Sequence, residues 1–433
     1  MNVFRPFLRL AALMAFGAAL VLGPAALAAD HAEPAAAAAH AAPADAHAAP
    51  AAQASGHGHA EAATPEPTIL QRFAYSYLTA FMFCLSIAMA GLIFVMIHHL
   101  FDAGWSVSVL RIAEHLACLT RPLFLALIPL LLLQGEIWRW LHVNPATDHS
   151  LDVKKVLFNR ITFNVVLAFV FGLWAWMATT FRKYSLAQDK DGSAIWTRKA
   201  RVLAAWGIYA FAFSLTLAVI MLMMSLQWQF FSTMYGVYYF AGSLWVTLAT
   251  IYGLARWLGT RELKPVVFPR QIHDLGVWFF AFTVFYAYIG FSQYFLIWNA
   301  AIPEETFWYV DRERGSWWAV GLTLLFGHFF LPFLVLLRID TKMSLAVMAP
   351  MVLWAWIMHY LDMTFNIMPV LYPKGLTITF FDPLCWFGLV AVLGWCFWQD
   401  YLKFPKWPLK HPRLKEAVTH HEVTGAGYAV EET

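Results

Sequence analysis

RQIHDLGVWFFAFTVFYAYIGFSQYFLIWNAAIPEETFWYVDRERG, the sequence of residues 270 to 315, establishes the fold class. From Val277 to Phe291 it carries no charge, and a helix rising about 1.5 Å per residue through this run crosses most of a hydrocarbon core about 30 Å thick. Polar residues gather at both ends of the run. Such groups are costly near lipid unless they face protein, water or a ligand, so the stretch predicts a transmembrane helix with candidate functional residues at its ends. The alternative is that they cap the helix and anchor it at the interface.

The whole chain has the composition of a polytopic membrane protein. Of its 433 residues, 61% are hydrophobic and 13% are charged, about half the charged fraction of soluble proteins. The net charge of +3 is not gathered into a basic face, which excludes nucleic acid as a partner. The four cysteines have no CxxC spacing, so we expect buried thiols and neither an iron–sulfur cluster nor a structural zinc site.

The first 66 residues precede the expected membrane domain. Residues 1–29 combine Arg5 and Arg9 with an apolar run and small residues at 26 and 28, which predicts a secretory signal peptide or, alternatively, a first transmembrane helix. Residues 30–66 are rich in Ala, Pro and His and contain no Lys or Arg. We expect a disordered periplasmic tether there, and its irregularly spaced histidines make metal binding the lesser alternative.

Nine apolar segments follow, in a multi-helix membrane domain that we expect at 70–400. They lie at about 75–97, 107–133, 157–181, 202–225, 237–258, 276–298, 317–338, 344–364 and 382–400. Pro122 and Pro129 predict a bend in the second span. The fold class is therefore all-α.

Positive charges predict the orientation of these spans. Lys and Arg concentrate in the loops 182–201 and 256–270 and in the tail 401–433, which the positive-inside rule places in the cytoplasm. The alternating loops hold few positive charges and many aromatic residues. With nine spans the tether is then periplasmic, and we expect a multi-pass protein of a bacterial inner membrane.

Polar residues that could take part in chemistry fall at three depths in this topology. Those expected on the outer side are His359, Asp362, Gln293, Tyr294, Glu304 and Glu305. Those expected on the inner side are Glu114, His273, Asp274 and Asp340. His328 falls near the middle of the seventh span, where only a partner or a cavity explains a histidine.

His359 and Asp362 are three residues apart and share a helix face. An imidazole beside a carboxylate can exchange a proton with a quinol hydroxyl near neutral pH, so the pair predicts a quinol site or a proton path together with the other outer residues. The alternative is a hydrogen-bonded pair that joins two helices. Arg111 and Glu114, at the same spacing, favour a structural ion pair.

No metal or haem is expected in this chain. Haem b needs axial histidines at matching depth on facing helices, and the span boundaries place His328 centrally but His359 in the outer third. The sequence predicts no covalently bound cofactor and leaves quinol or quinone as the ligand to consider.

Six segments together resemble the F subunit of bacterial alternative complex III, a respiratory quinol:cytochrome c or electron-acceptor oxidoreductase. They are GWSVSVLRIAEH (104–115), MMSLQWQFFSTMYGVYYFAG (223–242), QIHDLG (271–276), FSQYFLIWNAAIPEET (291–306), HFFLPFLVLLRIDTK (328–342) and HYLDMTFNIMP (359–369). The resemblance implies a fold related to the polysulfide-reductase membrane subunit, with two four-helix bundles side by side. It also implies partner subunits: a paralogous quinol-binding membrane subunit and subunits that carry haem c and iron–sulfur clusters.

The chain departs from that family pattern at three places. Met221 and Leu222 replace an Asp-Trp pair, Gln227 replaces an acidic residue, and WNAA at 298–301 replaces WYAN. The loss of the acid at position 221 removes one candidate proton carrier. The sequence therefore predicts a subunit that contributes to quinol handling or proton translocation and is not catalytic alone, with a structural scaffold subunit that has no quinone site as the alternative. A transporter is disfavoured because the two halves show no pair of broken helices.

Overall fold

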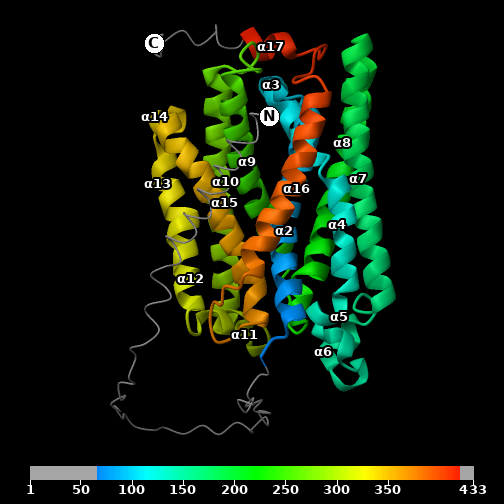
Figure 1. The fold of residues 1–433 in the computed structure, drawn as a ribbon, viewed down its shortest axis with the longest axis vertical. Coiled ribbons are helices and arrows are strands. Elements are labelled where there is room, and N and C mark those ends of the chain that lie inside the picture. Colours follow the sequence, from blue (N-terminus) through cyan, green and yellow to red (C-terminus); the bar gives the residue numbers. More distant parts are fainter. Residues whose placement is uncertain (1–65, 420–433) are drawn as a thin grey trace, which may run out of the picture.

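The computed structural model describes residues 66–419 (Figure 1). The expected signal peptide, the tether up to residue 65 and the tail from residue 420 lie outside the described residues. Within 66–419 the regular structure is helical, without a strand, and nine helices are long and apolar enough to cross a membrane. The predicted all-α, polytopic membrane fold is confirmed.

The spans are formed by continuous helices and by helices with one interruption. The continuous ones are α2 (Ile69–Phe101), α7 (Arg160–Asp191), α8 (Ala194–Leu222), α9 (Tyr235–Gly259), α10 (Pro269–Ala300), α15 (Leu345–Ile367) and α16 (Phe381–Lys403). The interrupted ones are α3 (Val107–Ala117) with α4 (Thr120–Leu132), and α12 (Trp317–Leu324) with α13 (Leu331–Leu337). The first interruption precedes Pro122, which has no N–H to offer the carbonyl of Cys118.

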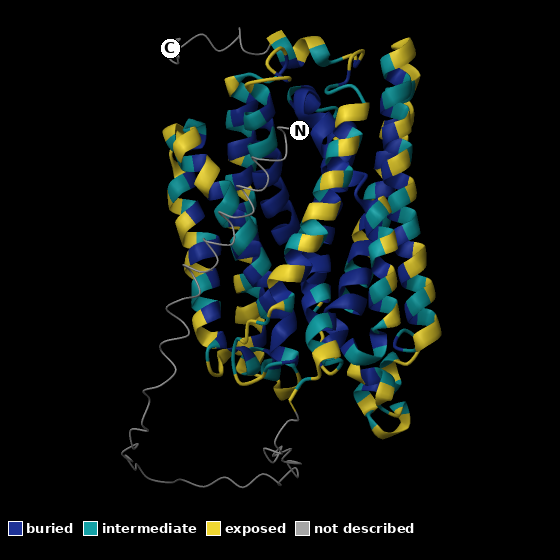
Figure 2. Cartoon of the chain, viewed as in Figure 1, coloured by how far each residue is buried: buried dark blue, intermediate teal, exposed yellow. Residues whose placement is uncertain are grey.

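Helix α2 lies at the centre of the molecule. It packs against α3, α4, α7, α8, α9, α15 and α16. Its most apolar window is 94% buried, as expected for a helix that is apolar on all sides. Figure 2 shows the reverse on α7 and α8, whose outward faces are exposed.

Two groups of four spans share this centre. The first contains α2, α3–α4, α7 and α8, and the second contains α9, α10, α12–α13 and α15. The two groups meet where α9 and α15 pack on α2, and α16 covers α2 as the ninth span. This pairing agrees with the expected two bundles side by side.

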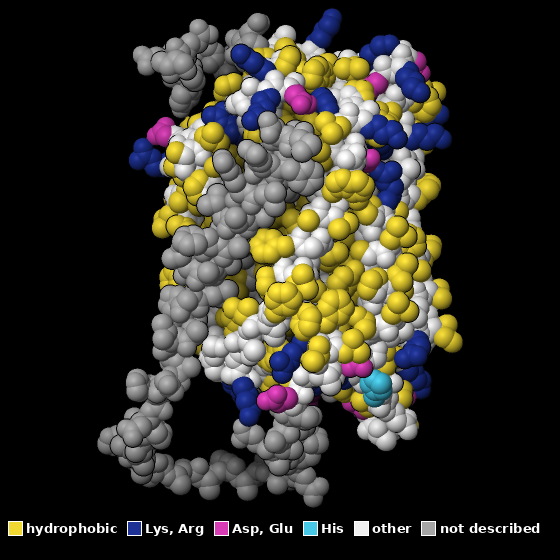
Figure 3. All heavy atoms as spheres, viewed as in Figure 1, with side chains coloured by type: hydrophobic (Ala, Val, Ile, Leu, Met, Phe, Trp, Pro, Cys, Tyr) yellow, Lys and Arg dark blue, Asp and Glu magenta, His cyan; other side chains and the backbone are white. Residues whose placement is uncertain are grey.

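On the face that Figure 3 shows, Lys and Arg are densest at one end, while apolar side chains form the band across the middle. We call this the basic end; it carries α14 (Ile339–Met343), α17 (Leu414–Thr419) and the α7–α8 connection. The opposite end carries α11 (Pro303–Glu313) and α6 (His149–Lys154), and we call it the α11 end.

The predicted loop 182–201 is wrong. Helix α7 continues to Asp191, and α8 begins at Ala194. Gly192 ends α7 with φ 70°, a left-handed backbone that glycine adopts without steric cost. Charged residues mark the boundary of the apolar run, but Lys, Arg and Gln are good helix formers and do not end a helix.

The segment after α16 folds back over the basic end. The Leu409 N–H donates to Asp189 Oδ1 at 2.8 Å, Arg413 pairs with Asp102 at 2.7 Å, and Gln271 donates to the Ala417 carbonyl at 2.7 Å. Residues 404–419 therefore tie the ends of α2, α7 and α10 together.

Candidate functional site

His328, His359 and Asp362 come together inside the second group of spans, and we call them the His–His–Asp cluster. All three side chains are fully buried. One ring nitrogen of each histidine and one oxygen of Asp362 lie within 4.8 Å of one another. Helix α15 presents His359 and Asp362 on one face, with Nδ1 of the histidine 4.0 Å from Oδ2 of the aspartate, as their spacing predicts.

The expected difference in depth between the two histidines is wrong. Their ring centroids are 6.4 Å apart. The span that holds His359 runs from Leu345 to Val370, beyond the predicted end at 364, so His359 lies near its middle. His328 is also central in its own span, Trp317–Leu337.

A π-helical turn, η5 (Leu325–Phe330), positions His328 between α12 and α13. Pro332 follows one turn later and cannot donate to the His328 carbonyl, and a widened turn accommodates its ring. Trp354 Nε1 donates to the Gly327 carbonyl at 2.7 Å. The His328 ring is stacked between Trp245 and Tyr286, with centroid distances of 3.7 and 3.8 Å, which fixes its plane and leaves only its edges for polar contacts.

His359 is held on its other side by α2 and α9. Its Nε2 lies 2.9 Å from Ser86 Oγ, and Ser86 Oγ donates to the Phe83 carbonyl at 2.7 Å. A Cβ at Gly242 of α9 would meet His359 Cε1 at 3.1 Å, so glycine allows α9 to pass close to this ring.

Oδ1 of Asp362 has a complete set of partners. The Tyr238 hydroxyl donates to it, and Asn366 Nδ2 approaches it at 3.1 Å. Tyr286 extends the chain, with its hydroxyl 2.6 Å from that of Tyr238. Among the described residues, Asp362 Oδ2, His359 Nδ1 and both ring nitrogens of His328 have no hydrogen-bond partner.

The spacing of these atoms decides what they can hold. Tetrahedral zinc sits about 2.0–2.1 Å from each ligand, which brings ligand atoms to about 3.4 Å from one another. In the cluster the His359–Asp362 separation is already 4.0 Å, and the other separations lie within 4.8 Å. The cluster is too open for such an ion as it stands and has the dimensions of a group of hydrogen-bonding side chains.

Four predicted outer residues lie apart from the cluster. Gln293 donates to the Tyr309 hydroxyl at 3.2 Å, and Tyr294 packs on the same ring at 5.0 Å. Glu304 and Glu305 occupy the first turn of α11, where acidic side chains stabilise a helix N-terminus. No hydrogen bond described for these residues reaches the cluster, and the expected grouping of Gln293 and Glu304 with Asp362 in one proton path stays a prediction.

Three predicted inner residues form surface pairs at the basic end. His273 and Asp274 contact each other at 3.4 Å, and Asp274 lies 3.7 Å from Arg270. Asp340 pairs with Arg338 at 2.9 Å, with both side chains about three-quarters exposed. Their positions favour helix anchoring over chemistry.

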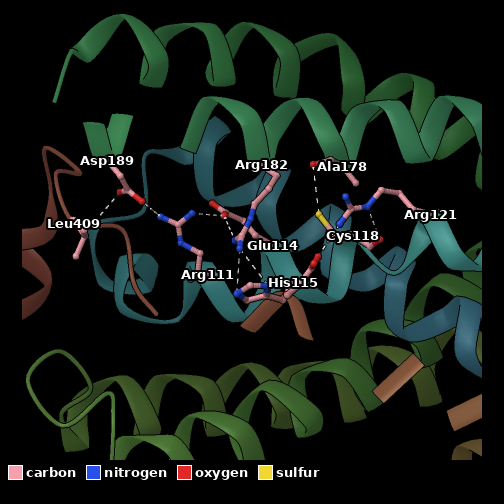
Figure 4. A network of polar contacts seen from close by, with 10 residues as sticks. Arg111, Glu114, His115, Cys118, Arg121, Ala178, Arg182, Asp189 and Leu409 are labelled. Carbon is pink, nitrogen blue, oxygen red and sulfur yellow. Dashed lines mark hydrogen bonds and ion pairs between the residues drawn. The ribbon is translucent and has the colours of Figure 1, made fainter. Parts of the chain in front are cut away.

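Glu114 is the centre of a buried ionic network (Figure 4). Its Oε2 lies 3.2 Å from Arg111 Nη1 and 2.9 Å from Arg182 Nη1. Arg111 also pairs with Asp189 at 2.5 Å. Two arginines and two carboxylates thus meet with no net charge, and the predicted Arg111–Glu114 ion pair is present.

Arg182 is the member of this network that sequence reasoning misplaced. It was expected among the loop charges, but its side chain is only 6% exposed. Its guanidinium lies 3.3 Å from the His115 ring nitrogens and 4.7 Å from the Phe404 ring. Its charge indicates an interfacial position, because the local sequence does not contain its carboxylate partner Glu114, which lies 68 residues away in the chain.

Several further residues of the site escaped the sequence reasoning. Asn366 had a signal, since it lies four residues after Asp362 on the same face. Tyr286 and Trp245 are buried within the bundle and Tyr238 is half-buried there, whereas their residue types are equally typical of interfacial belts. Ser86 carries no signal in its own segment.

Arg312 of α11 closes the α11 end of α15. Its guanidinium donates to the Phe365 carbonyl at 3.0 Å and to the Asn366 carbonyl at 2.8 Å, where the last carbonyls of a helix lack partners. It also donates to Gln227 Oε1 at 3.2 Å. Burial lowers the pKa of Arg312 to about 10, so the side chain stays charged at neutral pH and favours the negative end of the α15 dipole.

No family model matches the chain, and no curated protein matches it significantly. The functional proposal therefore rests on the geometry of the His–His–Asp cluster.

Proposed function

We propose that this chain is an integral membrane subunit of a respiratory quinol oxidoreductase complex and handles the protons of that reaction through the His–His–Asp cluster. One observation carries the proposal: a carboxylate and two imidazoles face one another deep in the bundle with four polar atoms unpartnered. Groups that only brace helices satisfy one another's hydrogen bonds. Ionisable groups without hydrogen-bond partners inside a membrane domain are typical of proton-transfer sites.

The chemistry required of these groups is reversible proton exchange. His359 Nδ1 can accept a proton, and Asp362 Oδ2 can release or accept one. The two atoms are 4.0 Å apart, and neither has a hydrogen-bond partner among the described residues. Because an imidazolium beside a carboxylate carries no more net charge than an imidazole beside a carboxylic acid, the pair can redistribute a proton without changing the charge buried in the bundle.

The wider assignment is supported by the resemblance to the F subunit of alternative complex III. In that setting the chain lies in a bacterial inner membrane beside a paralogous quinol-binding subunit and subunits with haem c and iron–sulfur clusters. The dense Lys and Arg at the basic end (Figure 3) support a cytoplasmic location for that end and for the C-terminus. Quinol or quinone is the proposed ligand, with no covalently bound cofactor.

The alternative is a scaffold subunit with no quinone site of its own. Two observations favour it: the acid of the family pattern is replaced by Met221, which is fully buried, and every charge of the Glu114 network is paired within the network. On this alternative the cluster contributes to assembly and not to turnover.

The two functions are separated by Asp362→Asn and His359→Gln, measured in complexes of confirmed subunit composition. If the cluster handles protons, each change should slow quinol-driven electron transfer or its coupled proton uptake by about 100-fold, the usual scale of a general acid or base. Asp340→Asn, an exposed carboxylate at the basic end, is the matched control. Unchanged turnover and unchanged proton stoichiometry per assembled complex in both cluster variants would leave only the scaffold function.

A further inference from the structure

We infer that the His–His–Asp cluster binds a single water molecule, and that Ser86 is a positioning residue which restricts the proton exchange of His359 to that water. The water site stands on the geometry of the cluster, whereas its use in proton transfer rests on the proposed function. His359 then binds and releases a proton at one ring nitrogen only.

The tautomer of His359 follows from counting hydrogens. A serine hydroxyl has one hydrogen, and that of Ser86 is donated to the Phe83 carbonyl at 2.7 Å. Ser86 Oγ can then only accept at its 2.9 Å contact with His359 Nε2. Nε2 therefore carries a hydrogen in both charge states of the ring, and Nδ1 is the one atom at which His359 can gain or lose a proton.

The same count leaves one free oxygen on Asp362. Tyr238 has one hydroxyl hydrogen and donates it to Oδ1, so the hydroxyl of Tyr286 is the donor at its 2.6 Å contact with Tyr238, and it also interacts with the Asp362 carboxylate. Asn366 Nδ2 also approaches Oδ1, at 3.1 Å. Oδ2 has no partner among the described residues and faces His359 Nδ1.

The distances fit a hydrogen-bonded water. For three atoms that all lie within 4.8 Å of one another, there is always a point no more than about 2.8 Å from each, which is the length of a good hydrogen bond to water. Buried waters usually make about three such bonds. When Asp362 is ionised and His359 is neutral, a water here donates to Asp362 Oδ2 and to His359 Nδ1 and accepts from an N–H of His328; when Asp362 is protonated, the water accepts from Oδ2 instead.

A direct bond between Oδ2 and Nδ1 does not explain the arrangement. Their 4.0 Å separation exceeds the range of a hydrogen bond. His328 also cannot turn its ring toward other partners easily, because Trp245 and Tyr286 lie against both of its faces. A bridging water supplies a partner to each of the three residues at once.

The proposed transfer balances in protons. Protonated Asp362 gives its Oδ2 hydrogen to the water oxygen while the water gives one of its own to His359 Nδ1. The products are the Asp362 carboxylate, the His359 imidazolium and the same water. Because Ser86 holds the Nε2 hydrogen, His359 returns the proton by the route on which it came.

The tautomer can be measured by ¹⁵N NMR of the detergent-purified chain labelled at histidine, with the His359 signal assigned by its loss in His359→Gln. We expect the form with hydrogen on Nε2 in the wild type. Ser86→Ala should reduce the ratio of the two tautomers by about tenfold, the effect of one lost hydrogen bond, and Ser86→Thr should restore it. A wild-type His359 with hydrogen on Nδ1 alone, or a ratio unmoved by Ser86→Ala, would overturn the role of Ser86.

The water is tested on the same preparation by infrared spectroscopy in H₂¹⁶O and H₂¹⁸O. We expect an O–H band of a bound water that shifts with the oxygen isotope and disappears in His328→Phe, which keeps the stacked ring and removes both nitrogens. His142→Phe, at an exposed histidine, is the control. A band that survives in His328→Phe and in Asp362→Asn would refute the site. Neither measurement needs turnover, so a water site with normal turnover in Asp362→Asn would refute the proposed function alone.

Discussion

Removing the charge of Glu114 tests the electrostatics of the membrane domain most directly. Glu114 shares one carboxylate between Arg111 and Arg182, whose side chains are 0% and 6% exposed. Glu114→Gln keeps the shape of the side chain and leaves two arginines against the single carboxylate of Asp189. One uncompensated positive charge then remains inside the bundle, and breaking a buried pair in this way costs about 3–5 kcal/mol.

The double variant Glu114→Gln with Arg182→Gln removes one charge of each sign. Arg111 and Asp189 remain, paired at 2.5 Å, and the site is neutral again. We expect its loss of stability to fall below the sum of the two single losses by at least about 1 kcal/mol, because the residues share one network.

Unfolding in mixed micelles of mild detergent and sodium dodecyl sulfate, followed by tryptophan fluorescence, gives the free energy of unfolding for each variant. Arg338→Gln breaks an exposed pair and should cost at most about 1 kcal/mol. Strict additivity of the two single changes, or a Glu114→Gln variant as stable as Arg338→Gln, would show that burial does not govern this network.

Two further predictions concern the ends of the bundle. Arg312→Gln should lower the unfolding free energy by about 3 kcal/mol or more, because it leaves buried carbonyls of α15 without a donor; Arg314→Gln, at a side chain 68% exposed, is the control, and equal losses in both would contradict the capping role. Burial lowers the pKa of His411 to about 4, below its unfolded value of about 6.5. Neutral His411 therefore contributes its full share of the free energy of unfolding above about pH 6.5. This share is lost as the pH falls toward 4, by at most about 3 kcal/mol. Thermal unfolding between pH 4 and 8 should therefore show that His411→Asn loses less stability on acidification than the wild type. An identical pH profile in the two proteins would refute this.

The sequence was a good guide to the membrane spans because each is an apolar run bounded by polar residues. It was a poor guide to where the helices end. The charged residues around Arg182 mark the limit of the apolar run, yet the backbone stays helical to Asp191. An ion pair buried by a distant segment cannot be recognised from local composition.

The candidate site was predictable only in part. Spacing on one helix brought His359 and Asp362 together, because i and i+3 lie on the same face of any helix. The approach of His328 depends on a π-helical turn and on the extent of the span that carries His359. The positions of Ser86 and Tyr238 depend on how α2 and α9 pack, which local patterns do not encode.

The central position of α2 bears on the order in which the protein is made. Of the nine spans within residues 66–419, α2 comes first in sequence, yet it ends up with neighbours on every side. During synthesis α2 is therefore inserted in the bilayer before its neighbouring helices have been translated. Its surface suits that interval, since a helix apolar all round is solvated by lipid tails as readily as by other helices. Each later helix then displaces lipid from α2, and the bundle assembles around this helix, which is already inserted in the membrane.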